Sequence, residues 1–80
     1  MTRVSKRPDV RVVLYTKPDC SLCDDARDLL AELGIDVVEA VDITYADRVP
    51  VIAVDGRIVA EGRVSKWGLR RAIRRAGRAR

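Results

Sequence analysis

Both cysteines of this 80-residue chain lie in one tetrapeptide, Cys20-Ser21-Leu22-Cys23. A bridge between them would close a very short loop and constrain the unfolded chain little, so it is a poor structural staple. A secreted fold stapled by disulfides would need more cysteines, spread through the sequence. The chain also has no histidine, which excludes Ser-His and Cys-His nucleophilic dyads. The two thiols are therefore candidates for chemistry, and the fold must be inferred from the apolar pattern.

Length and composition indicate one compact domain. Apolar residues make up 48% of the chain and charged residues 35%, which is too apolar for disorder and too charged for a membrane span. The longest uncharged apolar stretches are too short for a transmembrane helix. The basic N-terminus is not followed by the apolar run of a signal peptide, so we expect a cytoplasmic protein that does not contact a membrane.

Charge divides the chain into three parts. The central residues 12–62 carry eleven acidic and four basic side chains, whereas residues 63–80 carry eight basic side chains and no acidic one. Residues 1–11 have a net charge of +3. No repeat or linker separates these parts. We predict three segments, a basic tail over residues 1–9, a folded domain over 10–76 and a basic tail over 77–80.

The first half of the chain predicts a β-α-β unit. Residues 10–15 are rich in valine and lie between two prolines, which is typical of a buried strand. From Cys20 to Leu33 apolar residues recur at helical spacing, and Gly34 follows where a left-handed C-cap belongs. Residues 35–41 predict a second strand, which a right-handed crossover would place parallel to the first.

The second half predicts a hairpin and a last helix. Two apolar runs, residues 49–54 and 57–61, are separated by an Asp-Gly dipeptide that favours a type I′ turn. The last helix is expected to have a serine N-cap and to end at an alanine that a glycine follows; these residues are Ser65, Ala76 and Gly77. The fold class is therefore α/β, a sheet with two helices.

The position of the cysteines, directly after a strand and at the start of a helix, indicates redox chemistry. Unpaired N–H groups and the positive end of the helix dipole favour a thiolate at Cys20. Cys23 lies one helical turn later and can attack a mixed disulfide formed by Cys20. We expect Lys17 to help stabilise the thiolate and Asp24 and Asp25 to oppose it, so the effect is moderate.

Two sequence segments carry a resemblance to a known family. The run Thr16-Lys17-Pro18-Asp19-Cys20-Ser21-Leu22-Cys23-Asp24, followed downstream by Arg48-Val49-Pro50-Val51, resembles the small glutaredoxin-like family of the thioredoxin superfamily. The match covers about residues 10 to 75. It implies a thioredoxin-like β-α-β-β-β-α fold, with a four-stranded mixed sheet and two helices, and a thiol–disulfide oxidoreductase without a bound cofactor or metal.

The resemblance also implies roles for individual residues. Pro50 would be preceded by a cis peptide bond and lie against the Cys20–Cys23 disulfide. The backbone of Val49 would pair with a bound substrate as a short added strand. Lys17 resembles the lysine that glutaredoxins use for a glutathione carboxylate. The implied substrate is a disulfide-containing protein or a glutathione mixed disulfide.

The chain departs from the glutaredoxin pattern after its fourth predicted strand. Glutaredoxins have a Gly-Gly turn and an acidic pair there, whereas this chain has Glu61-Gly62-Arg63-Val64-Ser65. Ser65 and the following helix N-terminus could still bind a carboxylate. The electron donor therefore remains open between glutathione and a reductant of the thioredoxin-reductase type. Tyr45, in the loop beside the expected groove, is a further candidate for substrate binding.

A second departure concerns the superfamily's helix between the second and third strands. Only residues 42–49 are available, too few for an average helix with its connections. This helix should be shortened or missing, and one sheet face should lose its cover. The strands are apolar on both faces, so we expect this face to be covered by residues 1–9 or, preferably, by a second chain in a two-fold dimer.

The arginine-rich C-terminus supports a rival class, a nucleic-acid or acidic-partner binding module. A solvated helix face, partly neutralised by the acids of the first helix, is the simpler interpretation, because no aromatic residues interleave with the arginines. Tyr15, Tyr45 and Trp67 are interpreted as packing residues. Alternatives for the cysteines are a chance pair of thiols, or a zinc or iron–sulfur site pooled between two chains.

Overall fold

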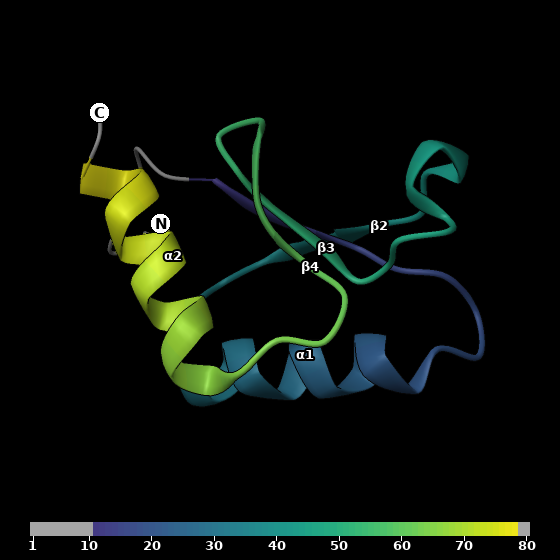
Figure 1. The fold of residues 1–80 in the computed structure, drawn as a ribbon, viewed down its shortest axis with the longest axis horizontal. Helices are drawn as coiled ribbons and strands as arrows, with labels where there is room; N and C mark the ends of the chain where they lie inside the picture. The colour runs from purple at the N-terminus through teal and green to yellow at the C-terminus, as the bar shows by residue number, and fades with distance from the viewer. Residues whose placement is uncertain (1–10, 79–80) are drawn as a thin grey trace, which may run out of the picture.

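A computed structural model describes residues 11–78, which form a mixed sheet with two helices (Figure 1). Within this part of the chain the sheet has four strands in the order β2-β1-β3-β4. β1 and β2 are parallel, and the other two neighbouring pairs are antiparallel. The elements in chain order are β1 (Val12–Tyr15), α1 (Ser21–Glu32), β2 (Val38–Ala40), the 3₁₀ turn η1 (Ile43–Tyr45), β3 (Val51–Val54), β4 (Arg57–Glu61) and α2 (Lys66–Arg78). This architecture confirms the predicted fold class.

Both helices contribute to one core on one face of the sheet. Alternate residues of β1 and β3 point to this face, because successive side chains of a strand alternate. Full burial of a Leu or Ile side chain contributes about 1.5–3 kcal/mol, so this cluster is the main source of stability. The cluster consists of Val12, Leu14, Ile52 and Val54 from the sheet, Ala26 and Leu30 from α1, and Leu69 from α2.

The predicted turn signals lie where the structure needs them. Gly34 has φ +73° directly after the C-cap of α1, Leu33, so the left-handed position falls on a glycine. Asp55 and Gly56 have φ +51° and +86°, as a type I′ hairpin requires at both central positions. These residues confirm the end of α1 and the β3–β4 hairpin. Among residues 11–78, neither helix combines the length and apolar character needed to cross a membrane.

Several predicted boundaries are wrong. The strand predicted over residues 49–54 begins at Val51. The second strand begins at Val38, not at residue 35, because β1 offers partners only from Val13 to Tyr15. Ile35 still packs against the core without belonging to the strand. The last helix continues through Gly77 to Arg78. A helical glycine costs only about 1 kcal/mol relative to alanine, so it does not by itself end a helix.

The connection between β2 and β3 is short, as predicted. It contains only the three-residue turn η1, whose N-cap Asp42 accepts a hydrogen bond from the Thr44 N–H at 2.9 Å. The chain crosses β1 in this stretch, because β1 lies between β2 and β3. In Figure 1, η1 lies on the side of the sheet away from α1. No longer helix is formed in this connection.

The sheet face opposite the helices carries exposed apolar side chains. Val38 pairs with Val13, and Ile58 pairs with Ala53, so all four point to this face. Val38 is 56% exposed and Ile58 38% exposed. Residues 1–9, which were expected as one possible cover, lie outside the described residues. Dimerisation through this face therefore stays a prediction.

We expect the chain to sediment as a dimer at micromolar concentration. Val38→Glu should shift it to the monomer, because a carboxylate would be buried without a partner between the sheets of the two chains. Ala31→Glu, on the exposed side of α1, introduces the same charge on the helical side and should leave the dimer intact. A wild-type chain that sediments as a monomer at this concentration would contradict this prediction.

Candidate active site

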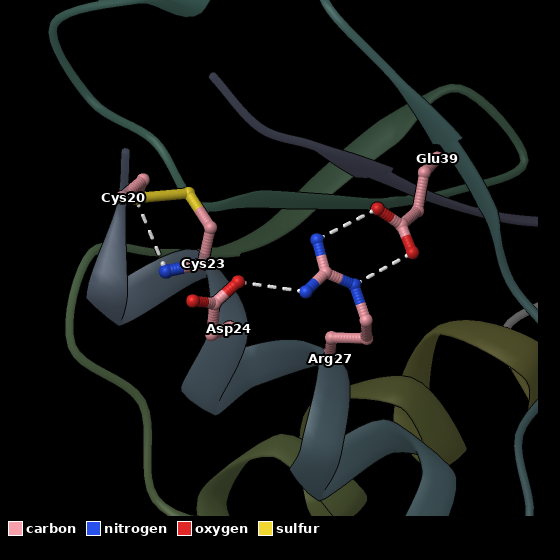
Figure 2. Close-up of a disulfide and its surroundings, with 5 residues drawn as sticks. All are labelled: Cys20, Cys23, Asp24, Arg27 and Glu39. Carbon is pink, nitrogen blue, oxygen red and sulfur yellow. Dashed lines mark hydrogen bonds and ion pairs between the residues drawn. A yellow bond between two sulfur atoms is a disulfide. The ribbon is translucent and has the colours of Figure 1, made fainter. Parts of the chain in front are cut away.

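The two cysteines form a disulfide at the N-terminal end of α1 (Figure 2). Cys20 is the N-cap of this helix, with extended backbone, and its Sγ accepts a hydrogen bond from the Cys23 N–H at 3.1 Å. Cys23 is buried to 1% exposure, whereas Cys20 is partly exposed. Their Cα atoms are 5.2 Å apart. An incoming sulfur would therefore reach Cys20 before Cys23.

The loop from β1 to α1 fixes Cys20 at the helix start. Thr16 is buried, and its N–H donates to the Ala40 carbonyl of β2 at 2.9 Å, which holds the beginning of the loop against the sheet. Asp19 adopts φ +56° and turns the chain immediately before Cys20. Lys17 is exposed on this loop, three residues before Cys20.

The segment that enters β3 lies at the same edge of the sheet. The Val49–Pro50 peptide bond is cis, which confirms the prediction from the family resemblance. Tyr15 pairs with Val51 in the antiparallel β1–β3 ladder, so Pro50 lies beside Thr16, where β1 runs into the cysteine loop. Pro50 is fully buried. The structure thus brings the proline and the cysteine loop to one edge.

The chain that leaves β4 completes this edge. The Gly62 N–H donates to the Pro50 carbonyl at 2.8 Å. Arg48 contacts Glu61 at 3.5 Å, and its guanidinium lies 5.3 Å from the centroid of the Tyr45 ring. The Tyr45 ring also packs on Tyr15, with centroids 4.6 Å apart. Tyr45 therefore packs on the fold, as one interpretation of the sequence held, and a contact with substrate stays a prediction.

Ser65 lies away from the sheet edge that contains Cys20 and Pro50. Its Oγ accepts a hydrogen bond from the Gly68 N–H at 3.1 Å, which confirms it as the N-cap of α2. The next residue, Lys66, contacts Glu32 at 3.2 Å, at the far end of α1 from Cys20. The 12 residues of α1 span about 18 Å at the usual helical rise. The N-cap of α2 therefore lies toward the C-terminal end of α1.

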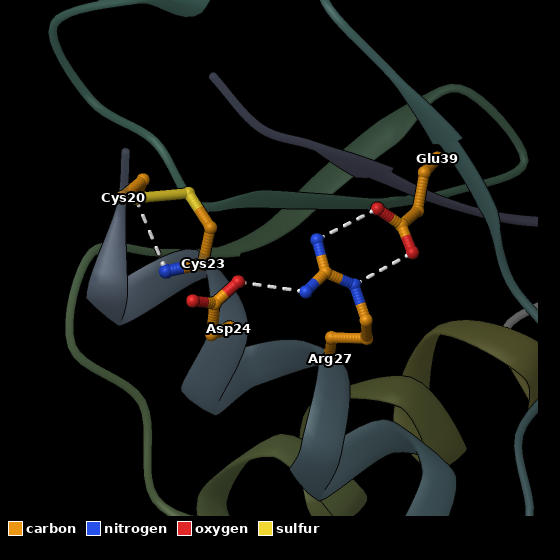
Figure 3. Close-up of polar contacts among 5 residues, drawn as sticks. All are labelled: Cys20, Cys23, Asp24, Arg27 and Glu39. Atoms are coloured by element: carbon orange, nitrogen blue, oxygen red, sulfur yellow. Dashed lines mark hydrogen bonds and ion pairs between the residues drawn. A yellow bond between two sulfur atoms is a disulfide. The ribbon is translucent and has the colours of Figure 1, made fainter. Parts of the chain in front are cut away.

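A charged network beside the disulfide was not found from the sequence (Figure 3). Arg27 on α1 binds Glu39 on β2 through two hydrogen bonds of 2.7 and 2.9 Å, and it binds Asp24 at 2.7 Å. The spacing of Asp24 and Arg27 along a helix was a visible signal. The bond to Glu39 depends on how β2 is placed against α1, which the sequence does not show.

This network changes the electrostatic environment of the cysteines. Figure 2 shows the Asp24 carboxylate directed at the Arg27 guanidinium. Asp24 was expected to oppose a thiolate at Cys20, and its pairing with Arg27 offsets part of that charge. Hydrogen bonding to Glu39 and then to Asp24 raises the pKa of Arg27. Hydrogen bonding to Arg27 lowers the pKa of Glu39, although desolvation opposes the change.

Arg27→Gln should raise the pKa of Glu39 toward its ordinary value of 4.5, measurable by NMR titration of the carboxyl group. A depressed carboxyl pKa stabilises the folded chain above the ordinary value, and this contribution is lost as pH falls through the lowered pKa. The variant should therefore lose a small stability increment at neutral pH and none at low pH, small because the ions are exposed. Arg57→Gln, an exposed arginine in β4, is the control; an unchanged Glu39 titration in Arg27→Gln would contradict the prediction.

A comparison with known protein families matches the part of the chain that contains the candidate site. Residues 11–74 match the family model described as "Glutaredoxin-like domain (DUF836)". This range contains Cys20, Cys23 and Pro50. No curated protein matches the chain.

Proposed function

The chain belongs to this glutaredoxin-like domain family, and we propose that it is a thiol–disulfide oxidoreductase acting through Cys20 and Cys23. The observation that carries the proposal is the arrangement of the two sulfurs. They are bonded to each other at the start of α1, with Cys20 partly exposed and Cys23 buried. This is the arrangement that a nucleophile and a resolving thiol need.

The reaction transfers two electrons to the substrate. In the reduced protein, the Cys20 thiolate attacks one sulfur of a substrate disulfide, forms a mixed disulfide and displaces the other substrate sulfur as a thiolate. The Cys23 thiolate then attacks Cys20 Sγ, releases the second substrate thiol and forms the Cys20–Cys23 bridge. The displaced substrate thiolates take up protons, and the bridge needs a two-electron reductant for the next cycle.

Val49 supports docking of an extended substrate next to Cys20. It lies outside β3, and its backbone makes no hydrogen bond to another described residue. The buried Pro50, whose carbonyl accepts the Gly62 N–H, fixes the position of Val49 at the edge of the sheet. A substrate segment containing cysteine can therefore pair with Val49 as a short added strand. The substrate in this proposal is a disulfide-containing protein or a glutathione mixed disulfide, with Lys17 available for a carboxylate.

Two kinds of electron donor are compatible with this reaction. Glutathione and a thioredoxin-reductase-type system both fit a cytoplasmic, reducing compartment. Glu61 is paired with Arg48, and Arg63 is exposed beside it, so this stretch offers no acidic pair to an amino group. Incubating the oxidised chain with glutathione, or with thioredoxin reductase and NADPH, and counting alkylated thiols by mass identifies the donor.

Cys23→Ser should trap substrate on Cys20 as a stable mixed disulfide, because the resolving thiol is gone. Cys20→Ser should trap nothing, because Cys23 is buried and its sulfur is not accessible to a substrate disulfide. Mass spectrometry after incubation with a disulfide substrate measures the adduct and its position.

Ser21→Ala is the matched control, since Ser21 is exposed between the two cysteines and carries no thiol. It should show no accumulated adduct and normal turnover. An adduct on Cys23 in Cys20→Ser, with none on Cys20 in Cys23→Ser, would reverse the assigned roles. The absence of any adduct in Cys23→Ser, with the fold intact, would contradict the proposed function.

A further inference from the structure

Helix α2 carries a basic face that the proposed redox reaction does not use. All its members are exposed, and their spacing places them on one side of the helix. The opposite side, with Leu69, Ile73 and Ala76, packs against the core. We call this surface the arginine face; it consists of Trp67, Arg70, Arg71, Arg74 and Arg75.

The charge of the arginine face is not neutralised within the described part of the chain. Lys66 pairs with Glu32 of α1, but the four arginines have no ion pair with any residue of 11–78. Helix α2 itself contains no acidic residue. The expected neutralisation by the acids of α1 therefore extends only to Lys66. Four unpaired guanidinium groups within two helical turns are suited to a polyanion.

Trp67 gives the arginine face an aromatic surface. It is 63% exposed, so its interpretation as a packing residue is wrong. Lys66 Nζ lies 5.7 Å from its ring centroid, and the Arg70 guanidinium lies 5.4 Å from it. An exposed indole beside cations can stack a nucleic-acid base while neighbouring guanidinium groups bind phosphate. The sequence was interpreted as having no aromatic residue interleaved with the arginines, and the structure places the exposed Trp67 ring next to Arg70.

We propose that the arginine face binds single-stranded nucleic acid, with phosphates on the arginines and a base stacked on Trp67. A nucleic acid matches this face better than an acidic protein does, because it offers regularly spaced phosphates with planar bases between them. Guanidinium groups also match the geometry of phosphate. A single strand fits better than a duplex, since paired bases do not present a ring face to an indole. In Figure 1, α2 lies at the opposite end of the molecule from the β1–α1 loop, so binding leaves the cysteines accessible.

Fluorescence anisotropy with a labelled oligothymidylate of about twelve nucleotides tests this proposal. Binding by the full chain should weaken as the salt concentration rises. A plot of log K against log[salt] should have a slope of about −3, from about −0.7 per phosphate for four contacts. Arg71→Gln and Arg74→Gln should each reduce the slope by about 0.7. Arg57→Gln removes the same charge from the hairpin and should leave the slope unchanged.

The contribution of Trp67 to binding can be measured separately. Trp67→Ala should weaken binding about tenfold, within the range measured for one stacked base. An abasic strand of the same length should bind the wild type correspondingly weakly and be insensitive to Trp67→Ala. Equal loss in Arg57→Gln, or competition by polyglutamate as strong as that by oligothymidylate, would overturn the proposal. Cys20→Ser should bind as the wild type does, so this test is independent of the redox proposal.

Discussion

The start of helix α1 is the constraint on which the candidate site depends. Cys20 caps this helix, and its sulfur accepts the Cys23 N–H at 3.1 Å. The first N–H groups of a helix have no partner within the helix, so an anion is most favourable there. The cap explains why the two sulfurs differ. One lies at the exposed start of the helix, and the other lies one turn inside it against the core, at 1% exposure.

The sheet brings three further segments to the same edge as this cap. Strand β1 ends there at Thr16, β3 begins there after Pro50, and β4 leaves there at Gly62, whose N–H binds the Pro50 carbonyl. The short β2–β3 connection preserves this edge, since it only has to cross β1. The turn η1 therefore occupies the connection in which the family resemblance predicted a shortened or missing helix.

Local signals were sufficient to predict most of the fold and the cysteine pair. Gly34, the Asp55-Gly56 turn and the N-cap Ser65 each determine the backbone of their own neighbours, so their effects are visible in the sequence. The cis bond before Pro50 was predicted only through the family resemblance, because few X-Pro bonds are cis. The pairing of Arg27 with Glu39 and the exposure of Trp67 were missed. Both depend on how elements pack against one another, which no local pattern shows.

The most direct test of this account is the reactivity of each thiol in the reduced chain. Iodoacetamide labelling at neutral pH, mapped by mass spectrometry, can be compared between the folded chain and the chain unfolded in urea. Because the helix N-terminus favours the thiolate, Cys20 should react faster in the folded chain than in the unfolded one, while buried Cys23 should react more slowly. If Cys20 gains no rate on folding, or if Cys23 is labelled first, the central claim is contradicted.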